Sequence, residues 1–526
     1  MQFTRRQGGA LALATLVAAR TGQAATPGVL VRSDSPPANL DPHQLYDVPM
    51  MGYALNTYDG LYRYENNPPE LLPWLASGHT ASADGLEWEF RLRPDTRFHD
   101  GTALIAEDVV YSFRRALALK RAPASAFLAI LKPENVTAPD TLTVRFKLDR
   151  AYGPFLAAIP IIAIVNSKLV RANEKDGDWG AGWLASNEAG SGAYSFVPGS
   201  LTTLEKLDMV RFAGHFLGWK DNPSPVPRIA IRAAKETSTG VLGLLNGSID
   251  WTDSYLPTDQ LEQIQNSRVA RVEKDVSMRT FIIRMNNARA PFSSLNVRKA
   301  FAHAFNYEGF IQEILKGYAD RNAGPVPNAL WGAPKDAPGY TYDLDKAKHF
   351  LKLAQAEGYN PKTPVRIHIQ SQLEQTNQAA QLYQSDLQSI GVNLRIVADT
   401  WANITAATGK PDTSPEMWIH WVSTYFVDPE NWVGQMYDSQ FHGTWKASSF
   451  YKNDKVDELL RRARGLVVQA ERAPLYEEAT RLVMADCADI WVYNTVELRG
   501  VSRRLSGYRF CPAGGGSEFR WLQMHG

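Results

Sequence analysis

Four hydrophobic residues alternate with four charged residues over positions 86–93. A period of two is typical of a strand with one buried face. A His-Asp-Gly turn follows at positions 99–101, and Gly101 can adopt a positive φ there. Hydrophobic residues then recur at helical spacing over positions 106–121. The pattern predicts a strand, a tight turn and an amphipathic helix.

The polar residues of this stretch have structural explanations. Glu107 and Asp108 fall in the first turn of the predicted helix, where the helix dipole favours anions. Lys120 and Arg121 fall near its end, where cations are favoured. We therefore interpret His99 as a turn residue, and we expect Asp108→Ala to cost only about 0.3–1 kcal/mol through the lost dipole interaction.

The same alternation of strands and helices continues along the chain. Further strands are predicted at positions 141–148, 279–286, 364–370 and 394–397. Helices are predicted at positions 296–317, 343–358 and 378–390, and two more between 454 and 487. Strands that alternate with helices indicate an α/β fold, and no internal repeat or low-complexity segment interrupts them.

The first 25 residues differ from the rest. Arg5 and Arg6 precede an apolar run at positions 10–19, and small residues follow it. This order predicts an export signal, which is too short for a membrane span, with cleavage after Ala24 or Ala25. The arginine pair resembles part of a twin-arginine signal, and export by that route or by the general secretory route stays open. No Cys follows the signal, so we expect no lipid anchor there.

Composition narrows the class of protein further. The chain has 526 residues, 44% of them hydrophobic, and a net charge of +1, so we expect a large core and no nucleic-acid partner. Cys487 and Cys511 are the two cysteines. In an oxidising compartment they either form a disulfide or remain two separate thiols, and the sequence leaves both possibilities open.

Motifs for common catalytic sites are absent from the sequence. There is no P-loop, no G-x-S-x-G elbow, and no H-E-x-x-H or CxxC pattern. The ten histidines are scattered along the chain. We therefore predict no enzyme, no catalytic residues, no metal site and no cofactor.

Several segments together resemble the extracellular solute-binding proteins of family 5, the periplasmic components of peptide, nickel and related ABC transporters. The clearest resemblance is "WEFRLRPDTRFHDGTALIAEDVVYSFRRAL", which starts at Trp88. The further segments are "GSGAYSF", "NVRKAFAHAFNYEGFIQEILKGYADRNAGPVP", "DLDKAKHFLKLA", "IGVNLRIV", "DPENW" and "YKNDKVDELLRRAR". They occur in the family's order and span most of the chain.

This resemblance implies a two-lobed periplasmic binding protein fold of type II with an extra domain. Lobe I would comprise residues 26–72, 189–274 and 499–526, and lobe II residues 275–498. The accessory domain would comprise residues 73–188 and would contain the stretch at 86–121. The opening stretch is then scaffold, and the ligand would be enclosed between the lobes by a hinge closure.

The resemblance also implies which segments line the cleft. In lobe I, Ser33, Asp34 and Ser35 follow the first strand. In lobe II, the corresponding residues are Trp401, Trp421, Thr424, Tyr425, Asp428, Tyr493 and Asn494. Aromatic walls would supply apolar contact area in such a cleft.

One position departs from the family's pattern. Peptide binders of the family often carry an Asp about four residues before the Pro that corresponds to Pro429, and this Asp pairs with the ligand's α-ammonium. Here the position falls at Thr424 or Tyr425, and neither is acidic. A buried ammonium without a counter-charge is costly. A modified peptide, an opine-like compound or a sugar-like compound therefore stays open beside a standard peptide.

The function that these residues predict is a monomeric, soluble periplasmic receptor. It would capture a peptide or peptide-like solute and deliver it to the permease of an ABC importer. A nickel or metal-chelate receptor is the first alternative, with His420 and His442 near the cleft. A secreted hydrolase whose site is assembled only in space is the second.

Overall fold

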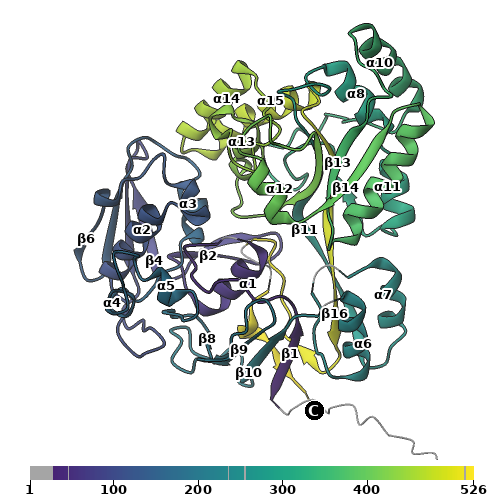
Figure 1. The fold of residues 1–526 in the computed structure, drawn as a ribbon. Helices are drawn as coiled ribbons and strands as arrows, with labels where there is room; N and C mark the ends of the chain where they lie inside the picture. Colours follow the sequence, from purple (N-terminus) through teal and green to yellow (C-terminus); the bar gives the residue numbers. More distant parts are fainter. Residues whose placement is uncertain (1–27, 46, 235, 254–255, 514–516, 526) are drawn as a thin grey trace, which may run out of the picture.

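The computed structural model describes residues 28–45, 47–234, 236–253, 256–513 and 517–525. The predicted export signal at residues 1–25 lies outside these residues. Figure 1 shows three bodies: lobe I at the bottom, the accessory domain at the left in blue, and lobe II at the top in green. The two-lobed α/β fold with an extra domain is confirmed.

Lobe I is built on a four-stranded sheet in the order β1-β10-β9-β8. The edge strand β1 pairs parallel with β10, and β9 and β8 continue the sheet antiparallel. Its strands are β1 (Val29–Ser33), β8 (Tyr194–Phe196), β9 (Lys206–Arg211) and β10 (Arg228–Arg232). Around it lie α1 (Val48–Thr57), α6 (Thr237–Asn246), α7 (Thr258–Gln265), the hairpin β2 (Tyr62–Glu65) and β3 (Glu70–Pro73), and the pair β17 (Leu505–Ser506) and β18 (Gln523–Met524).

The accessory domain contains the stretch that opened the sequence analysis. The alternating residues form β5 (Glu87–Leu92), and the amphipathic segment forms α2 (Ala106–Leu119), so both predictions are confirmed. Strand β5 lies inside an antiparallel sheet of order β4-β5-β7-β6. The other elements are β4 (Ala76–Ala81), β6 (Val136–Asp140), β7 (Thr143–Lys147), α3 (Phe155–Ala158), α4 (Ser167–Ala172) and α5 (Ala181–Leu184).

Lobe II is built on a six-stranded mixed sheet in the order β12-β16-β11-β15-β13-β14. Its strands are β11 (Ala270–Met285), β12 (Ala319–Arg321), β13 (Val365–Gln370), β14 (Leu394–Asp399), β15 (Met417–Val422) and β16 (Asp489–Ser502). Its helices are α8 (Leu295–Ala304), α9 (Tyr307–Gly309), α10 (Leu344–Ala356), α11 (Glu374–Ser389), α12 (Trp401–Ala407), α13 (Val433–Tyr437), α14 (Asp454–Gly465) and α15 (Gln469–Ala485). Two hydrophobic clusters fill this lobe.

Two long strands connect the lobes. Strands β11 and β16 pair antiparallel from Ala270–Ser502 at one end to Arg284–Asp489 at the other, with register shifts near the middle. Trp251 of lobe I makes backbone bridges to both Arg32 and Val501, so the end of β16 continues toward the lobe I sheet. Figure 1 shows β11 and β16 running between the two lobes. This pair is where a hinge closure would bend.

The prediction of one continuous helix at 296–317 is wrong, because the helix is interrupted after Ala304. Helix α8 ends at Ala304, and Phe305 has an extended backbone. Asn306 then caps a new helix by accepting a hydrogen bond from the Gly309 amide at 2.9 Å, and a π-helical turn follows. Asn competes with the helical backbone through such side-chain contacts, so a second start signal inside a periodic segment divides it.

The hydrophobic cores divide the chain differently from the predicted domain boundaries. Leu61 and Tyr64 of the β2–β3 hairpin pack in the accessory core, although they were assigned to lobe I. Val170 and Leu184 pack in the lobe I core, although they were assigned to the accessory domain. The two cores therefore share residues across both predicted boundaries, and the boundaries themselves stay a prediction.

Cys487 and Cys511 are both free. Cys487 is buried in the lobe II core, and Cys511 packs against the accessory core. Burial raises the pKa of each thiol to about 12. Of the two possibilities that the sequence left open, the structure has two separate thiols.

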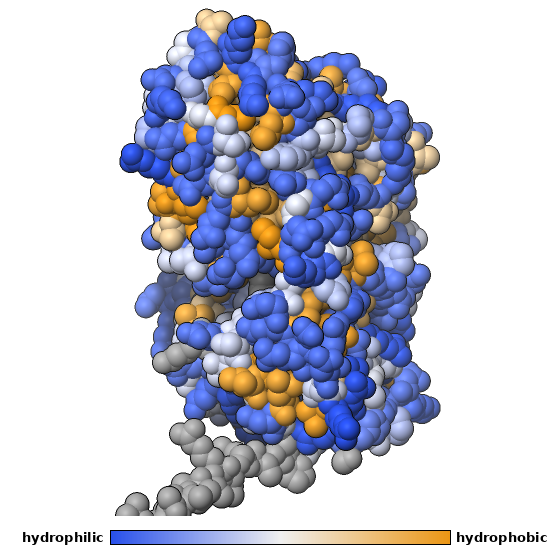
Figure 2. All heavy atoms as spheres, turned by 90° about the vertical axis from the view of Figure 1, so that its right-hand side faces the viewer, coloured by the Kyte–Doolittle hydropathy of each residue, from blue (hydrophilic) through white to orange (hydrophobic). Residues whose placement is uncertain are grey.

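The face of the molecule in Figure 2 is mostly hydrophilic, with small groups of hydrophobic residues. Individual exposed hydrophobic residues such as Leu242 are normal on a globular surface. Within the described residues, no helix combines the length and apolar character that crossing a bilayer requires.

Candidate functional site

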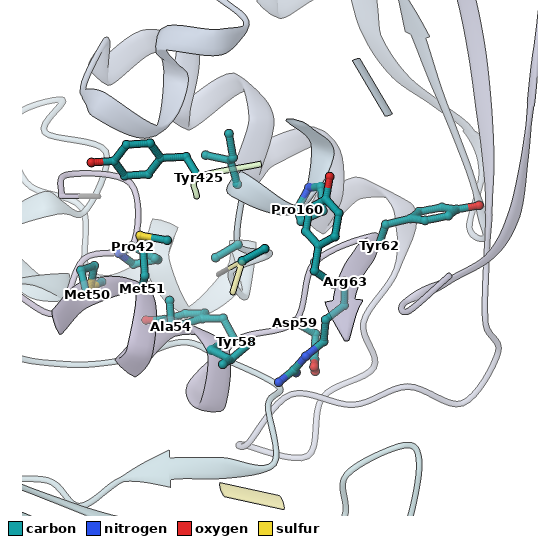
Figure 3. Close-up of a pocket in the computed structure, with 16 residues that line it drawn as sticks. Pro42, Met50, Met51, Ala54, Tyr58, Asp59, Tyr62, Arg63, Pro160 and Tyr425 are labelled. Carbon is teal, nitrogen blue, oxygen red and sulfur yellow. The ribbon is translucent and has the colours of Figure 1, made fainter. Parts of the chain in front are cut away.

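An apolar cavity of about 70 Å³ lies where the three bodies meet. One wall comes from α1 of lobe I, with Met50, Met51 and Ala54, and another from Pro160 and its neighbours. Lobe II contributes Tyr425, and Figure 3 shows its side chain on the same side of the pocket as Met50 and Met51. The volume corresponds to about two water molecules, so it accommodates one small apolar group rather than a whole peptide.

A larger cavity of about 360 Å³ adjoins the first and shares Leu55, Arg63 and Tyr64 with it. It lies between lobe I and the connecting strand β11, which contributes Asp275. Its lining is polar and aromatic: Glu65, Asn66, Asn67, Arg509, Phe510, Cys511, Glu518 and Trp521 complete it. Its volume lies within the range of about 300–1,000 Å³ that is typical of ligand pockets. The two cavities together form the candidate binding site.

The charges of this larger cavity are positioned by the β2–β3 hairpin and by the C-terminal part of lobe I, residues 499–526, which we call the return segment. Arg63 forms an ion pair with Glu518 at 3.1 Å, and its guanidinium lies 4.6 Å from the Trp74 ring centroid. Asp275 accepts a hydrogen bond from the Tyr508 hydroxyl at 2.6 Å. The ion pair neutralises Arg63 and Glu518, and the hydroxyl of Tyr508 satisfies one oxygen of Asp275.

Tyr425 is the predicted ligand residue that lines a described cavity. The ammonium of Lys446 lies 4.4 Å from the centroid of its ring, in cation–π geometry. Lys446 also donates to Asn431 Oδ1 at 3.0 Å and to Gln435 Oε1 at 2.5 Å. Burial lowers the pKa of Lys446 to about 7. A buried amine that is only partly protonated at neutral pH therefore lies behind this part of the site, and the charge of Glu430 acts on it.

The two predicted tryptophans lie in aromatic clusters rather than in the two cavities. Trp401 begins α12, and its ring centroid lies 5.8 Å from Trp418 and 5.1 Å from Trp445. Trp421 is 6% exposed and packs edge-on against Phe281 at 4.9 Å. Their contact with a ligand stays a prediction.

Thr424, Tyr493 and Asn494 are all nearly inaccessible. Thr424 forms a backbone bridge with Ala513 of the return segment, so this contact joins lobe II to lobe I. Tyr493 stacks on Phe281 with ring centroids 4.7 Å apart. Asn494 accepts a hydrogen bond from the Thr280 hydroxyl at 3.2 Å. The bridge at Thr424 shows that its segment lies at the boundary between the lobes.

The predicted lobe I residues lie at the end of β1. Ser33 is buried, and its amide donates to the Trp251 carbonyl at 2.8 Å. Asp34 is ion-paired with Arg32, and it also accepts from the Ser35 amide at 2.8 Å. None of the three lines either cavity.

Asp428 has a structural role that argues against ligand contact. It is 2% exposed, and its two carboxylate oxygens accept from Arg472 at 2.7 and 2.8 Å. One oxygen also accepts from the Glu430 amide and caps the short turn that follows. Its charge is thus engaged by Arg472, and its contact with a ligand stays a prediction.

The two histidines of the metal-chelate alternative do not form a metal site. His420 is fully buried and stacks on Trp418 with centroids 4.0 Å apart. His442 is hydrogen-bonded to the Tyr451 carbonyl at 2.9 Å. Among the residues that the structure describes, no group of three or more His, Cys, Asp or Glu residues could hold a metal ion.

Sequence reasoning missed most of the cavity lining. Met50 and Met51 lie on a short helix whose start signal, Asp47, was readable, since Asp47 accepts from the Met50 amide at 2.9 Å. Arg63 and Glu65 lie on a strand of only four residues. Nothing local distinguishes these residues, because the cavity arises only when the return segment packs beside them.

Comparisons with known proteins agree with the fold. A model of the bacterial extracellular solute-binding proteins, family 5, matches residues 70–443. The probable D,D-dipeptide-binding periplasmic protein DdpA of Escherichia coli is 29% identical over 90% of each chain. The heme-binding protein A of Haemophilus influenzae is 26% identical over 87% of this chain and 85% of that protein.

Solved structures have the same architecture. The periplasmic binding protein DppA from Helicobacter pylori, in complex with the peptide STSA, superposes with a TM-score of 0.83 at 24% identity, covering 95% of this chain and 98% of that one. The dipeptide-binding protein from Pseudoalteromonas, in complex with Met-Leu, has a TM-score of 0.82 at 20% identity, covering 94% and 100%.

Proposed function

The chain belongs to the bacterial extracellular solute-binding proteins of family 5, and we propose that it binds a short peptide or peptide-like solute for an ABC importer. The observation that carries this proposal is the pair of adjoining cavities at the junction of the lobes, one apolar and one charged. A peptide carries both kinds of group on one small molecule. The dipeptide specificity named for the Escherichia coli relative supports the same class.

The mechanism follows from the connecting strands. Tyr425 of lobe II already lines one cavity with Met50 and Met51 of lobe I, so opening about β11 and β16 would separate them and admit a ligand, and closure would restore this arrangement. The ligand would be enclosed there, and water would be displaced from the apolar cavity. The protein would then present its closed form to a membrane permease. Export through the signal at residues 1–25 and a monomeric state belong to this proposal.

Calorimetry tests the proposal directly. We expect the purified mature protein to bind at least one of three probes, D-Ala-D-Ala, Met-Leu or the tetrapeptide STSA. Tyr425→Ala should weaken that binding by about tenfold, because it removes an aromatic wall of the apolar cavity. Tyr342→Ala, which alters a tyrosine that is 38% exposed in lobe II, is the matched control. A wild-type protein that binds none of the probes would contradict the proposal.

A further inference from the structure

The charged cavity of about 360 Å³ is lined by an acid and a base that form no direct ion pair, Glu65 and Arg509. Burial raises the pKa of Glu65, whereas the charges of Arg63, Arg509 and Arg520 lower it. Glu65 Oε1 is buried and has no hydrogen-bond partner within the described residues. Arg509 stacks on the Trp521 ring at 3.8 Å, and it forms no ion pair with any carboxylate that the structure describes. A buried carboxylate oxygen without a donor is costly unless a ligand supplies one.

The other charges of the cavity are already engaged. Arg63 pairs with Glu518, and Glu518 also accepts from the Trp521 indole at 2.9 Å. Asp275 is held by Tyr508 and by Arg499 at 3.5 Å. The hairpin turn beside Glu65 is fixed to the connecting strand, because the Asn67 side chain donates to the Val276 carbonyl at 2.9 Å. The cavity is thus a rigid frame with one acidic and one basic group available.

Lobe II offers no comparable acid. Asp428 is paired with Arg472, and Glu430 with Arg464 at 2.8 Å. The position that carries an acid in peptide binders of the family is neutral here, and Lys446 lies behind Tyr425. With a pKa of about 7, Lys446 is only partly protonated at neutral pH, and it offers an ammonium bound beside Tyr425 no counter-charge.

We infer that the charged cavity is the subsite for the two termini of a zwitterionic ligand, with Glu65 binding the ammonium and Arg509 the carboxylate. This inference rests on the proposed function and specifies its substrate as a short peptide with free ends. The two cavities share Leu55, Arg63 and Tyr64, so one molecule can place its termini in the charged cavity and an apolar side chain against Met50 and Met51. Recognition of the termini is thereby a property of lobe I.

The experiment compares free and blocked forms of the tightest-binding probe among D-Ala-D-Ala, Met-Leu and STSA. We expect Glu65→Gln to weaken binding of the free peptide by at least about tenfold and to leave the affinity of its N-acetyl form unchanged. Glu70→Gln, on the opposite strand of the same hairpin, is the control and should leave both affinities unchanged. Thermal unfolding of each variant establishes that it is folded.

A second variant keeps the test independent of Glu65. Arg509→Ala removes an exposed side chain, and we expect it to weaken binding of the free acid but not of the C-terminal amide. Equal losses for the free and blocked forms, or no loss with either variant, would overturn the inference while leaving the proposed function intact. A wild-type protein that binds none of the three probes would overturn both.

Discussion

Two charged regions of this protein differ in what surrounds them. Beneath the lobe II loop that carries Tyr425, the buried acids Asp428, Glu430 and Asp438 are all paired with Arg464 or Arg472. Around the lobe I cavity, Glu65 and Arg509 are not paired within the described residues. A compensated charge can hold a structure together, whereas an uncompensated charge beside a cavity can bind a ligand. The role of a charged residue therefore depends on its partners more than on its position in a motif.

We expect the largest loss of stability from a variant that breaks the buried ion pair between Arg472 and Asp428. Arg472→Ala leaves the buried Asp428 without its two hydrogen bonds, so we expect a loss of about 3–5 kcal/mol in the free energy of unfolding. Arg509→Ala at the cavity should change that free energy by no more than about 0.5 kcal/mol. Urea denaturation measures the free energy of unfolding of both variants. Similar losses for Arg472→Ala and Arg509→Ala would contradict the difference between the two regions.

A second paired cluster makes the folded state sensitive to acid. His43 donates to the Ala163 carbonyl through Nε2 at 2.8 Å and accepts from Arg115 at 3.1 Å, which fixes the neutral ring. Burial, together with the Arg115 charge, lowers the pKa of His43 from 6.5 to about 4. The unfolded chain therefore binds a proton that the folded chain does not, and stability falls as the pH drops from 6.5 to 4.

We expect His43 to contribute on the order of 3 kcal/mol to the loss of unfolding free energy between pH 6.5 and pH 4. Unfolding free energies measured between pH 7 and pH 4 should show a shallower dependence for His43→Gln than for the wild type. Parallel curves for the two proteins would show that His43 is not the group responsible.

Asp108 of the accessory domain is a further buried acid whose hydrogen bonds are all made within the protein. The sequence suggests only a dipole interaction, but Asp108 is 3% exposed and accepts from the Ile105 amide and from both the amide and the hydroxyl of Ser167. Asp108→Ala would leave these donors unpaired, so we expect a loss of about 1–3 kcal/mol rather than a few tenths. Chemical denaturation measures it, and peptide affinity should stay unchanged. A weaker affinity would instead mean that Asp108 acts on the cavity wall that Pro160 contributes.

The last prediction tests the contact between the accessory domain and the lobe II ion pairs formed by Arg464 and Arg472. The Gly153 amide donates to the Arg464 carbonyl at 2.8 Å, and a Cβ at Gly153 would lie 2.0 Å from the Leu466 carbonyl oxygen. The added methyl group would also lie 2.7 Å from Arg472 Nε. We therefore expect Gly153→Ala to lower the free energy of unfolding by about 1–3 kcal/mol and to weaken peptide binding by up to about tenfold. Gly78→Ala, in the same domain with no atom within 4 Å of its Cβ, is the control. Calorimetry that finds equal affinities for the two variants would contradict this role.

The local elements could be predicted because their signals are local. The strand at 86–93, the helix at 106–121 and the helix at 343–358 all form as expected. The break at Phe305 was missed, since helical periodicity continues across it. Membership of a known architecture was also readable, because several modest segments occur in a specific order.

The sequence by itself determined the α/β elements, the family and the absence of an acid at Thr424 and Tyr425. Only the tertiary structure decided which charged residues are available to a ligand. Glu65 and Arg509 are more than 400 positions apart, yet they line one cavity. Asp428 and Glu65 are both carboxylates near the lobe boundary, and no local pattern distinguishes them. The difference arises from long-range packing, which places Arg472 against the first and leaves an oxygen of the second without a donor.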